Sequence, residues 1–555
     1  MPKITIDGKV FEVEEGLTIL EAARRNGIEI PHFCWHPALS ISGNCRMCLV
    51  EIEKMPKLMI SCQMLVSDNM VIHTNSERVI KARQAVMEFL LINHPLDCPI
   101  CDEAGQCKLQ EYTFKYSVGQ SRFNEDKNEK QKRVKIGPYV IFDAERCISC
   151  SRCIRFCNEI AKKPQLTFVN RGDRVTIETF PGEELDNPYS MNTIDICPVG
   201  ALTSADFRFK ARVWEMSFTD SICIGCSRGC NIKIGVRNNE ILRLEPRENL
   251  DVNKYWMCDK GRLETYQHVN SNTRIKSPLI KRDGKFQEVG WDEAIAQVAS
   301  DIKNYKPEEI YGIGSAYSSL EDNFLFYKFL SQIVKTSGID YIPHILPDDE
   351  DDILIRADKT PNSRGVKELG ITPINIGQNI SYLRNAIREK KIKLLYVMND
   401  DIFTISELAE VAHYLDVLIV HATNRNRTTE IAKIVLPCST FAEINGTFVN
   451  FEGRVQRAFP AVSTLERERT MDFYQLSRLD KFGTQFDRWN RANKRDCRPS
   501  WKILTRLARL FGVVWDYNIA EDVFNEIANT IPAFEGLSYE IISNKGAWLK
   551  KKYKE

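Results

Sequence analysis

Cysteine carries most of the chemistry that this sequence can perform. Of eighteen cysteines, sixteen lie before residue 260 in tight groups, and only Cys438 and Cys497 follow. Thiolates bind metal ions and iron–sulfur clusters. Disulfides are the competing use, but the recurring C-x2-C spacings suit metal chelation better. The cysteines thus divide the chain into a metal-rich front half and a cysteine-poor back half.

The first group follows the elements of a small ferredoxin. Lys3–Ile6 and Val10–Val13 alternate apolar and polar residues around Asp7-Gly8, which predicts a hairpin. A capping box at Thr18–Glu21 predicts a helix before the cysteine loop. This order indicates a β-grasp domain holding a [2Fe–2S] cluster, with zinc as the alternative. Set 1 is Cys34, Cys45, Cys48 and Cys62, spaced C-x10-C-x2-C-x13-C.

The second group contains a histidine. Its pattern, H-x3-C-x2-C-x5-C, can bind zinc or a [4Fe–4S] cluster, and the histidine can also be only a hydrogen-bonding neighbour. The cluster is favoured because the neighbouring segments bind clusters. A neutral imidazole in place of a thiolate removes one negative charge, which should raise the reduction potential. Set 2 is His94, Cys98, Cys101 and Cys107, after a predicted helix over residues 77–93.

The third group has the C-x2-C-x2-C-x3-C run of a bacterial ferredoxin. In such a run the fourth cysteine, here Cys157, serves a second cluster, and the first cluster takes a distant Cys-Pro. A second cluster would need cysteines where Asn187, Ser190 and Thr193 stand. We therefore predict one [4Fe–4S] cluster and a buried, unligated Cys157, with ligation by Cys157 instead of Cys197 as the alternative. Set 3 is Cys147, Cys150, Cys153 and Cys197.

The fourth group is spaced C-x2-C-x3-C-x27-C and contains tight turns at Ile224-Gly225 and Arg228-Gly229. It predicts a [4Fe–4S] cluster in a short β-rich module, with zinc as the alternative. The acidic run at residues 348–352 is predicted to be a solvated loop rather than a cation site. Set 4 is Cys223, Cys226, Cys230 and Cys258.

From about residue 290 the pattern becomes one of alternating helices and buried strands, which predicts a parallel α/β layer. No G-x-G-x-x-G or Walker motif is present, so we expect no flavin or nucleotide site on this chain. The predicted helices are Trp291–Tyr305, Leu320–Val334 and Ile405–Tyr414, and the predicted strands are Glu309–Gly314, Lys393–Met398 and Val417–Val420.

The totals exclude several classes of protein. The 555 residues carry a net charge of +1, which gives no argument for nucleic acid or for an anionic membrane surface. No apolar run approaches the ~20 residues of a membrane-spanning helix. The N-terminus resembles neither a secretory signal nor a transit peptide, so we expect the protein to act in the cytoplasm.

In order and spacing, the four sets together resemble those of the large iron–sulfur subunits of respiratory complex I, the NADH–quinone oxidoreductase. The resemblance covers essentially the whole chain, and set 4 resembles an optional cluster, off the main electron path, that only some members retain. Residues 443–456 also resemble a segment of molybdopterin oxidoreductases. However, the roughly 295 residues after Gly261 are too few for a complete molybdenum enzyme, and Cys438 is the only late ligand candidate.

The resemblance implies a multidomain α+β and α/β protein with one [2Fe–2S] cluster, three [4Fe–4S] clusters, no molybdenum and no flavin. The expected domains are a [2Fe–2S] ferredoxin-type domain (1–77), a helical [4Fe–4S] segment with one histidine and three cysteine ligands (78–117), a bacterial-ferredoxin-like domain with a single cluster (118–215), a [4Fe–4S] module of molybdenum-enzyme type (216–272) and a molybdopterin-oxidoreductase-like scaffold (273–555).

The same resemblance implies an electron-transfer role without substrate chemistry on this chain. Electrons from an NADH/FMN-binding subunit would enter at set 1 and pass through sets 3 and 2 towards quinone. The implied partners are that subunit, the small [2Fe–2S] subunit and the quinone-side subunits of the peripheral arm. The expected location is the cytoplasmic side of the bacterial inner membrane, with membrane attachment only through partner subunits.

Three rival functions remain open at this point. An NAD-linked formate dehydrogenase would need molybdenum, a longer chain and normally a second ferredoxin-type cluster. A multimeric hydrogenase could use such a chain for electron transfer, although the back half lacks the cysteine motifs of an [FeFe] catalytic cluster. A zinc-stabilised scaffold without redox activity would be colourless.

Overall fold

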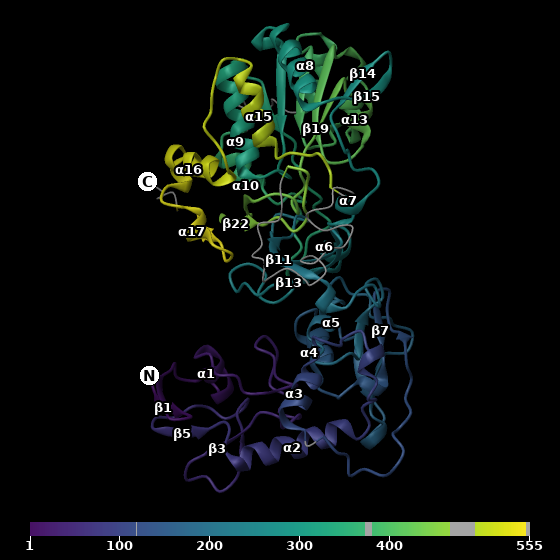
Figure 1. Ribbon diagram of the computed structural model, residues 1–555, viewed down its shortest axis with the longest axis vertical. Helices are drawn as coiled ribbons and strands as arrows, with labels where there is room; N and C mark the ends of the chain where they lie inside the picture. Colours follow the sequence, from purple (N-terminus) through teal and green to yellow (C-terminus); the bar gives the residue numbers. More distant parts are fainter. Residues whose placement is uncertain (118, 372–379, 467–493, 551–555) are drawn as a thin grey trace. The chain divides into compact units, whose positions relative to one another are not determined.

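The computed structural model describes residues 1–117, 119–371, 380–466 and 494–550. The chain divides into two compact units, Met1–Trp214 and Glu215–Glu555 (Figure 1). Within the described residues, no helix combines the length and the apolar character needed to cross a bilayer.

Unit 1 begins with a five-stranded sheet in the order β2-β1-β5-β3-β4. β1 pairs antiparallel with β2 and parallel with β5, and helix α1 packs its apolar side against the sheet. Asp7 and Gly8 form the predicted hairpin turn, with φ angles of 47° and 81°. The β-grasp prediction is therefore confirmed. The bounds are β1 (Lys3–Ile6), β2 (Lys9–Glu12), α1 (Ile19–Arg25), β3 (Leu49–Ile52), β4 (Met59–Ile60) and β5 (Met70–His73).

Two helices follow the sheet and lie on either side of set 2 in the chain. α2 (Glu77–Leu91) precedes the set and α3 (Lys108–Tyr116) begins directly after Cys107. The buried Arg83 on α2 donates hydrogen bonds to the carbonyl of Leu49 at 3.0 Å and to the Tyr116 hydroxyl at 3.2 Å. α2 is therefore fastened to the first domain and to α3 by one guanidinium.

The remainder of unit 1 is a small α+β domain around two antiparallel sheets. One sheet has the order β10-β7-β6, and the other is the pair β8-β9. Cys153 and Cys157 lie on α4, and the other cysteines of the ferredoxin run lie in the loop before it. The bounds are β6 (Val134–Lys135), β7 (Val140–Phe142), α4 (Arg152–Glu159), β8 (Leu166–Val169), β9 (Thr176–Thr179), α5 (Asn192–Asp195) and β10 (Leu202–Ser204).

Unit 2 opens with a three-stranded antiparallel sheet, β11-β12-β13, as the prediction of a β-rich module requires. The strands are β11 (Ser217–Ile222), β12 (Asn231–Arg237) and β13 (Glu240–Pro246), followed by the short helices α6 (Asp259–Leu263) and α7 (Gln267–Asn270). The cysteines of set 4 lie at the end of β11, in the loop to β12, and just before α6.

The rest of unit 2 is built on a seven-stranded sheet in the order β15-β14-β20-β19-β18-β16-β17. Strands β16 to β20 run parallel and the edge hairpin β14-β15 runs antiparallel, so the predicted parallel α/β layer is confirmed. The bounds are β14 (Leu279–Arg282), β15 (Lys285–Glu288), β16 (Ile310–Gly314), β17 (Ile339–Tyr341), β18 (Leu394–Met398), β19 (Val417–Ala422) and β20 (Ile434–Pro437).

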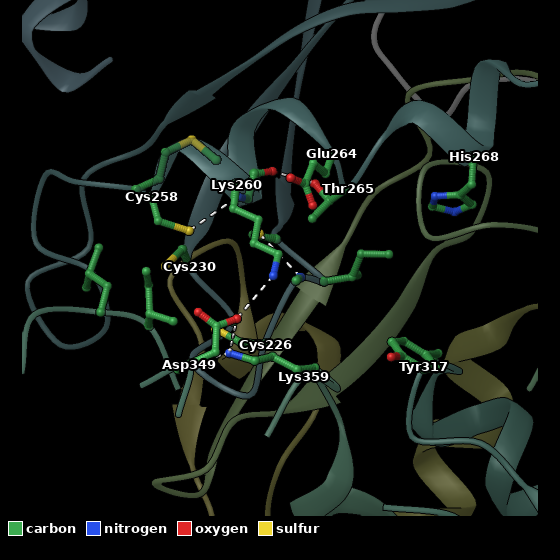
Figure 2. A pocket seen from close by; sticks show the side chains of 18 residues that line it. Cys226, Cys230, Cys258, Lys260, Glu264, Thr265, His268, Tyr317, Asp349 and Lys359 are labelled. Atoms are coloured by element: carbon green, nitrogen blue, oxygen red, sulfur yellow. Dashed lines mark hydrogen bonds and ion pairs between the residues drawn. The ribbon is translucent and has the colours of Figure 1, made fainter. Parts of the chain in front are cut away.

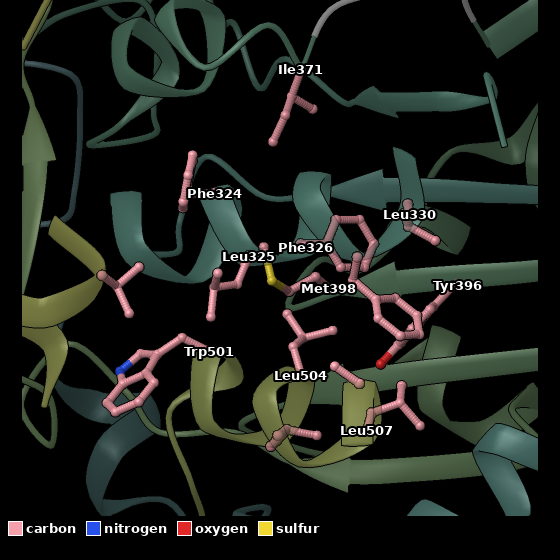
Figure 3. Close-up of a cluster of buried hydrophobic side chains, with 14 of the residues drawn as sticks. Phe324, Leu325, Phe326, Leu330, Ile371, Tyr396, Met398, Trp501, Leu504 and Leu507 are labelled. Carbon is pink, nitrogen blue, oxygen red and sulfur yellow. The ribbon is translucent and has the colours of Figure 1, made fainter. Parts of the chain in front are cut away.

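Apolar cores cover both faces of this sheet, as expected for parallel strands. On one face, α9 and α15 pack over Tyr396 and Met398, with Phe326 and Leu504 between the layers (Figure 3). This face is covered by α8 (Trp291–Lys303), α9 (Leu320–Lys328), α15 (Ser500–Arg509) and α16 (Ala520–Thr530), and the other by α11 (Ile380–Arg388), α12 (Ser406–Ala409) and α13 (Arg427–Ile431). A small sheet of β21 (Gly446–Val449), β22 (Arg454–Ala458) and β23 (Ala547–Trp548), together with α10 (Ser363–Glu368) and α17 (Tyr539–Ile542), completes the unit.

Two helix predictions differ from the structure. The single helix predicted over Ile405–Tyr414 is instead α12 and a separate 3₁₀ turn at Ala412–Tyr414. Leu408 and Val411 are fully buried, and two short turns bury such apolar positions as well as one helix does. The helix predicted over Leu320–Val334 has an α-helical first part and a π-helical second part, Phe329–Val334.

We expect Leu325→Ala to lower the free energy of unfolding of unit 2 by about 3 kcal/mol, because it leaves a cavity in a fully buried site. The matched control is Leu250→Ala, at a side chain that is 62% exposed, which should cost less than about 0.5 kcal/mol. Urea unfolding followed by circular dichroism measures both. Equal losses in the two variants would contradict this description of the core.

Candidate metal centres

Set 1 gathers at one edge of the β-grasp domain. Cys48 directly precedes β3 and Cys62 follows β4, and the antiparallel pairing of these strands brings the two side by side. The Ser61 N–H donates to the Cys48 carbonyl at 3.1 Å and closes the turn. Cys34 and Cys45 come from the long loop before β3. The four thiols are buried or half-buried, as a cluster site shielded from water requires.

The thiols of set 1 form two close pairs. The thiol of Cys45 bonds to Cys34, which lowers the pKa of Cys34 and raises that of Cys45, and backbone N–H groups and Arg155 add to the lowering at Cys34. The bond between Cys62 and Cys48 likewise lowers the pKa of Cys48 and raises that of Cys62. A [2Fe–2S] cluster takes two protein ligands on each of its irons. Two pairs of thiols, Cys34 with Cys45 and Cys48 with Cys62, match that requirement.

Set 2 lies in the chain between α2 and α3. Burial, reinforced by Arg146, lowers the pKa of His94 to about 4, so the imidazole is neutral at pH 7. Its Nδ1 atom is buried and has no hydrogen-bond partner among the described residues. A buried, neutral and unpartnered ring nitrogen is costly unless something binds it. His94 therefore fits a metal ligand better than a hydrogen-bonding neighbour. Cys101 and Cys107 are buried and Cys98 is half-buried.

Set 3 lines one small cavity. All four cysteines of the set contribute to it, together with the apolar side chains Phe142, Ile148, Ile177, Val199 and Leu202. Burial raises the pKa of Cys153 and of Cys197, and the other thiols of the set add to both shifts. The Ser149 N–H donates to the Cys147 sulfur at 3.4 Å. Thiols in such a cavity can lose their protons only against a compensating positive charge, which iron supplies.

Cys157 does not line that cavity. It is fully buried on α4, and burial raises the pKa of its thiol to about 12. The geometry therefore favours Cys197 over Cys157 in set 3.

The place where a second ferredoxin cluster would lie is closed by hydrogen bonds. Asn187 donates to Gln165 Oε1 at 2.8 Å, and the Thr193 hydroxyl donates to the Ser190 carbonyl at 2.6 Å. All three of the residues that replace cysteines there are buried. Their hydrogen bonds engage these polar groups within the protein, so the structure favours a single cluster in this domain.

Set 4 surrounds a cavity of about 260 Å³, seen in Figure 2, where Cys226, Cys230 and Cys258 face one another. Backbone N–H groups point at the sulfurs, from Gly225 to Cys223 at 3.5 Å and from Gly261 to Cys258 at 3.2 Å. A Cβ atom on Gly261 would lie 3.1 Å from both of those sulfurs. This glycine therefore leaves free space beside both sulfurs. The four thiols of the set all line the cavity.

The acidic run lies at the rim of this cavity. Asp349 forms ion pairs with Lys260 at 3.1 Å and with Lys359 at 3.0 Å, as Figure 2 shows. The Asp351 carboxylate accepts hydrogen bonds from three successive backbone N–H groups, of which the first, at Ile353, is at 2.9 Å. The run forms a loop, as predicted, but its internal bonds also order it around set 4.

The back half contains a buried ion pair that the sequence did not single out. Arg274 and Glu443 form it at 2.9 Å, with side chains that are 1% and 0% exposed. The thiol of Cys497 donates to the same Glu443 oxygen at 3.6 Å, and Cys438 is also fully enclosed. Cys497 follows no recognisable motif, so only the fold reveals that it contacts Glu443, the first residue of the segment resembling molybdopterin oxidoreductases.

Within the described residues, no three or more His, Cys, Asp or Glu side chains are arranged to hold a single metal ion. Zinc binds thiolate sulfur at about 2.3 Å, so four sulfurs on one zinc lie within about 4 Å of one another. Clusters distribute their ligands over two or four irons and keep them farther apart. Cluster ligands can therefore lie farther apart than the ligands of one metal ion.

Comparisons with known protein families match the domains in the predicted order. The matches are the 2Fe-2S iron-sulfur cluster binding domain (residues 2–77), the NADH-ubiquinone oxidoreductase-G iron-sulfur binding region (83–122), the ferredoxin-like domain of NADH-quinone oxidoreductase subunit 3 (137–203), the molybdopterin oxidoreductase Fe4S4 domain (216–271) and molybdopterin oxidoreductase (274–345 and 362–479). These matches confirm the predicted fold class and its order of domains.

Longer relatives agree with the domain matches. The G subunit of the NADH-quinone oxidoreductase of Rickettsia bellii is 46% identical over 333 residues, which cover 60% of this chain and 48% of that protein. The NADH-ubiquinone oxidoreductase 75 kDa subunit of Reclinomonas americana is 44% identical over 334 residues, again 60% of this chain and 48% of that protein. The chain thus spans about half the length of the curated relatives it matches.

Among solved structures, an NAD+-reducing [NiFe]-hydrogenase in the H2-reduced state is 27% identical, covering 38% of this chain and 91% of that chain with a TM-score of 0.35. The domain matches and the curated relatives agree: over 333 residues the chain is similar to the G subunit of the NADH-quinone oxidoreductase of Rickettsia bellii.

Proposed function

We propose that this chain is the iron–sulfur electron-transfer subunit of an NADH:quinone oxidoreductase and relays electrons from a flavin- and NADH-binding subunit towards quinone. The observation that carries the proposal is the gathering of the thiols of set 3 and of set 4 around one cavity each, with those of set 1 in two bonded pairs. The buried Nδ1 of His94, unpartnered among the described residues, adds to it for set 2. Four such sets in one chain suit electron transfer rather than a single catalytic centre.

We propose that each set supplies the ligands of one cluster. Set 1 would hold a [2Fe–2S] cluster, and sets 2, 3 and 4 would each hold a [4Fe–4S] cluster. Bound clusters would supply one-electron redox chemistry without making or breaking substrate bonds. The protein's own part is to hold the ligands, exclude water and set the charge around each site.

Set 3 contacts set 2 through its ligand loop. The Lys108 N–H, next to Cys107, donates to the Pro198 carbonyl, next to Cys197, at 3.2 Å. A Cβ atom on Gly200 would lie 2.4 Å from the Cys101 sulfur, so only glycine permits this close approach.

An ion pair reinforces the junction. Arg146, which precedes Cys147, forms an ion pair at 2.7 Å with Asp97, which precedes Cys98. Set 3 also contacts set 1, through helix α4. Its position between the other two sets supports the electron order set 1, set 3, set 2.

The back half supports set 4 as a scaffold. The Gln456 amide donates to the Gly229 carbonyl at 2.9 Å, and the Ser227 N–H donates to the Asp358 carbonyl at 2.8 Å. Two segments of the α/β domain thus clamp the cysteine loop. We infer that this domain works without molybdenum. The residues at its molybdopterin-like segment, with Cys497 bonded to Glu443, are already engaged with one another.

The proposed setting is a peripheral position on the cytoplasmic side of a bacterial inner membrane. Partners would be the NADH/FMN-binding subunit, the small [2Fe–2S] subunit and the quinone-side subunits of the peripheral arm, and membrane attachment would come only through them. The proposal includes no flavin and no nucleic acid on this chain.

Metal analysis after anaerobic purification tests the function. We expect about fourteen irons per chain, the sum for one [2Fe–2S] and three [4Fe–4S] clusters, and EPR signals on reduction. Stoichiometric zinc without colour would instead identify a scaffold protein. Stoichiometric molybdenum would identify a formate dehydrogenase-type enzyme, and co-purification of a flavin-binding partner would support the complex.

Gly200→Ala tests the contact between sets 2 and 3. The added methyl group would overlap the Cys101 sulfur, so we expect the loss of about four irons, those of one [4Fe–4S] cluster. Gly290→Ala is the matched control, since no atom lies within 4 Å of a Cβ there, and it should keep the full iron content. Full iron in the Gly200 variant would show that this approach is not needed.

His94→Cys tests the ligand assignment in set 2. A fourth thiolate adds one negative charge, so the midpoint potential of this cluster should fall while the other clusters keep theirs. His73→Cys, at a half-exposed ring outside all four sets, is the control. A redox titration followed by EPR measures the shift, and an unchanged potential in His94→Cys would remove His94 from the ligands.

A further inference from the structure

Helix α4 carries two arginines, one turn apart, that lie between set 1 and set 3. Arg152 Nη2 donates to the Trp35 carbonyl at 2.5 Å, and its Nη1 donates to the Ile196 carbonyl at 3.0 Å. Trp35 follows Cys34, and Ile196 precedes Cys197. One planar guanidinium therefore joins the backbone beside a ligand of set 1 to the backbone beside a ligand of set 3.

Arg155 repeats this arrangement on the ligands themselves. Its Nη2 donates to the Cys34 carbonyl at 2.5 Å and to the Cys150 carbonyl at 3.4 Å. Its Nη1 donates to the Ser40 carbonyl, and its Nε donates to the Ser151 hydroxyl at 3.1 Å. Arg155 is therefore in direct contact with one ligand residue from each set.

The surrounding contacts hold the same two loops together. The Asn44 amide, beside Cys45, donates to the Ser149 carbonyl, beside Cys150, at 3.0 Å. Glu159 on α4 accepts a hydrogen bond from the Ser40 N–H at 2.8 Å. The charged groups that make these bonds across the junction are two arginines, Arg152 and Arg155, and one carboxylate, Glu159. Positive charge therefore exceeds negative charge among them.

The junction between sets 3 and 2 has the opposite charge. There Arg146 forms ion pairs with Asp97 at 2.7 Å and with Asp143 at 2.9 Å, so two carboxylates face one guanidinium. The charge of Arg152, by contrast, acts on thiols of both sets that it joins, with Cys150 first among them. Its Nε is buried and has no partner among the described residues, which leaves a donor at this site.

We propose that Arg152 and Arg155 are positioning residues that form a cationic bridge between the clusters of sets 1 and 3, hold their ligand loops together and raise both reduction potentials. The proposal rests on the proposed function. Reduction adds a negative charge to a cluster, and a fixed positive charge nearby stabilises the reduced form. Guanidinium suits the role because it stays charged and its planar fork reaches two carbonyls at once.

The test is an EPR-monitored redox titration of the anaerobically purified full chain, comparing wild type with Arg152→Gln. We expect the midpoint potential of each of the two clusters to fall by ~59 mV, which corresponds to a tenfold change in the one-electron equilibrium constant. Arg152→Lys keeps the positive charge, so both midpoint potentials should stay close to their wild-type values. Arg122→Gln, at a side chain that is 84% exposed and paired with Glu88, is the control for a lost charge and should shift neither.

Each outcome decides the proposal. Wild-type potentials in an Arg152→Gln protein that retains both clusters would overturn it. If the Arg152→Gln protein does not retain both clusters, the Arg155→Gln protein is titrated instead, since Arg152 still joins the two loops in that variant. Wild-type potentials in the Arg155→Gln protein would likewise overturn the bridge. A wild-type protein without EPR signals would overturn the proposed function as well, whereas normal signals with unshifted variants would overturn the bridge alone.

Discussion

The structure depends on one constraint: its buried thiols can lose their protons only beside a compensating positive charge. Burial raises the pKa of the cysteines in set 3, as it does for Cys223 and Cys258 in set 4, so the isolated protein favours neutral thiols. Iron binds thiolates and releases those protons, which couples cluster binding to folding and to pH. Cluster binding and the order of the ligand loops therefore belong to one equilibrium.

In the cysteine loops, the space around the sulfurs is shaped by backbone groups and glycines rather than by larger side chains. N–H groups point at sulfur in sets 3 and 4, and glycines stand where a Cβ would enter the ligand space, as at Gly200 and Gly261. Hydrogen bonds to cluster ligands are among the factors that set reduction potentials. The same backbone features therefore shape the cavities and would influence the reduction potentials of clusters bound there.

Charge differs between the two junctions of unit 1, although both use arginine. Arg146 is outnumbered by carboxylates, whereas Arg152 and Arg155 share their junction with Glu159. Both junctions join residues at or next to members of two sets, so each holds two cysteine loops together. In unit 2 the clamp on set 4 combines neutral bonds from Gln456 and main-chain groups with an ion pair between Arg228 and Glu452 at 3.8 Å.

The sequence by itself determined what depends on local spacing. The C-x2-C repeats, the Asp7-Gly8 hairpin and the buried strands of the α/β layer each lie within a few residues, where chain geometry leaves little choice. The tertiary structure decided what depends on residues far apart in the chain. It placed Cys197 rather than Cys157 at the cavity of set 3, brought Cys497 to Glu443, and divided the helix predicted over Ile405–Tyr414. These features depend on packing and hydrogen bonds between segments that are far apart in the chain. The spacing of residues along the chain does not indicate which distant segments come into contact.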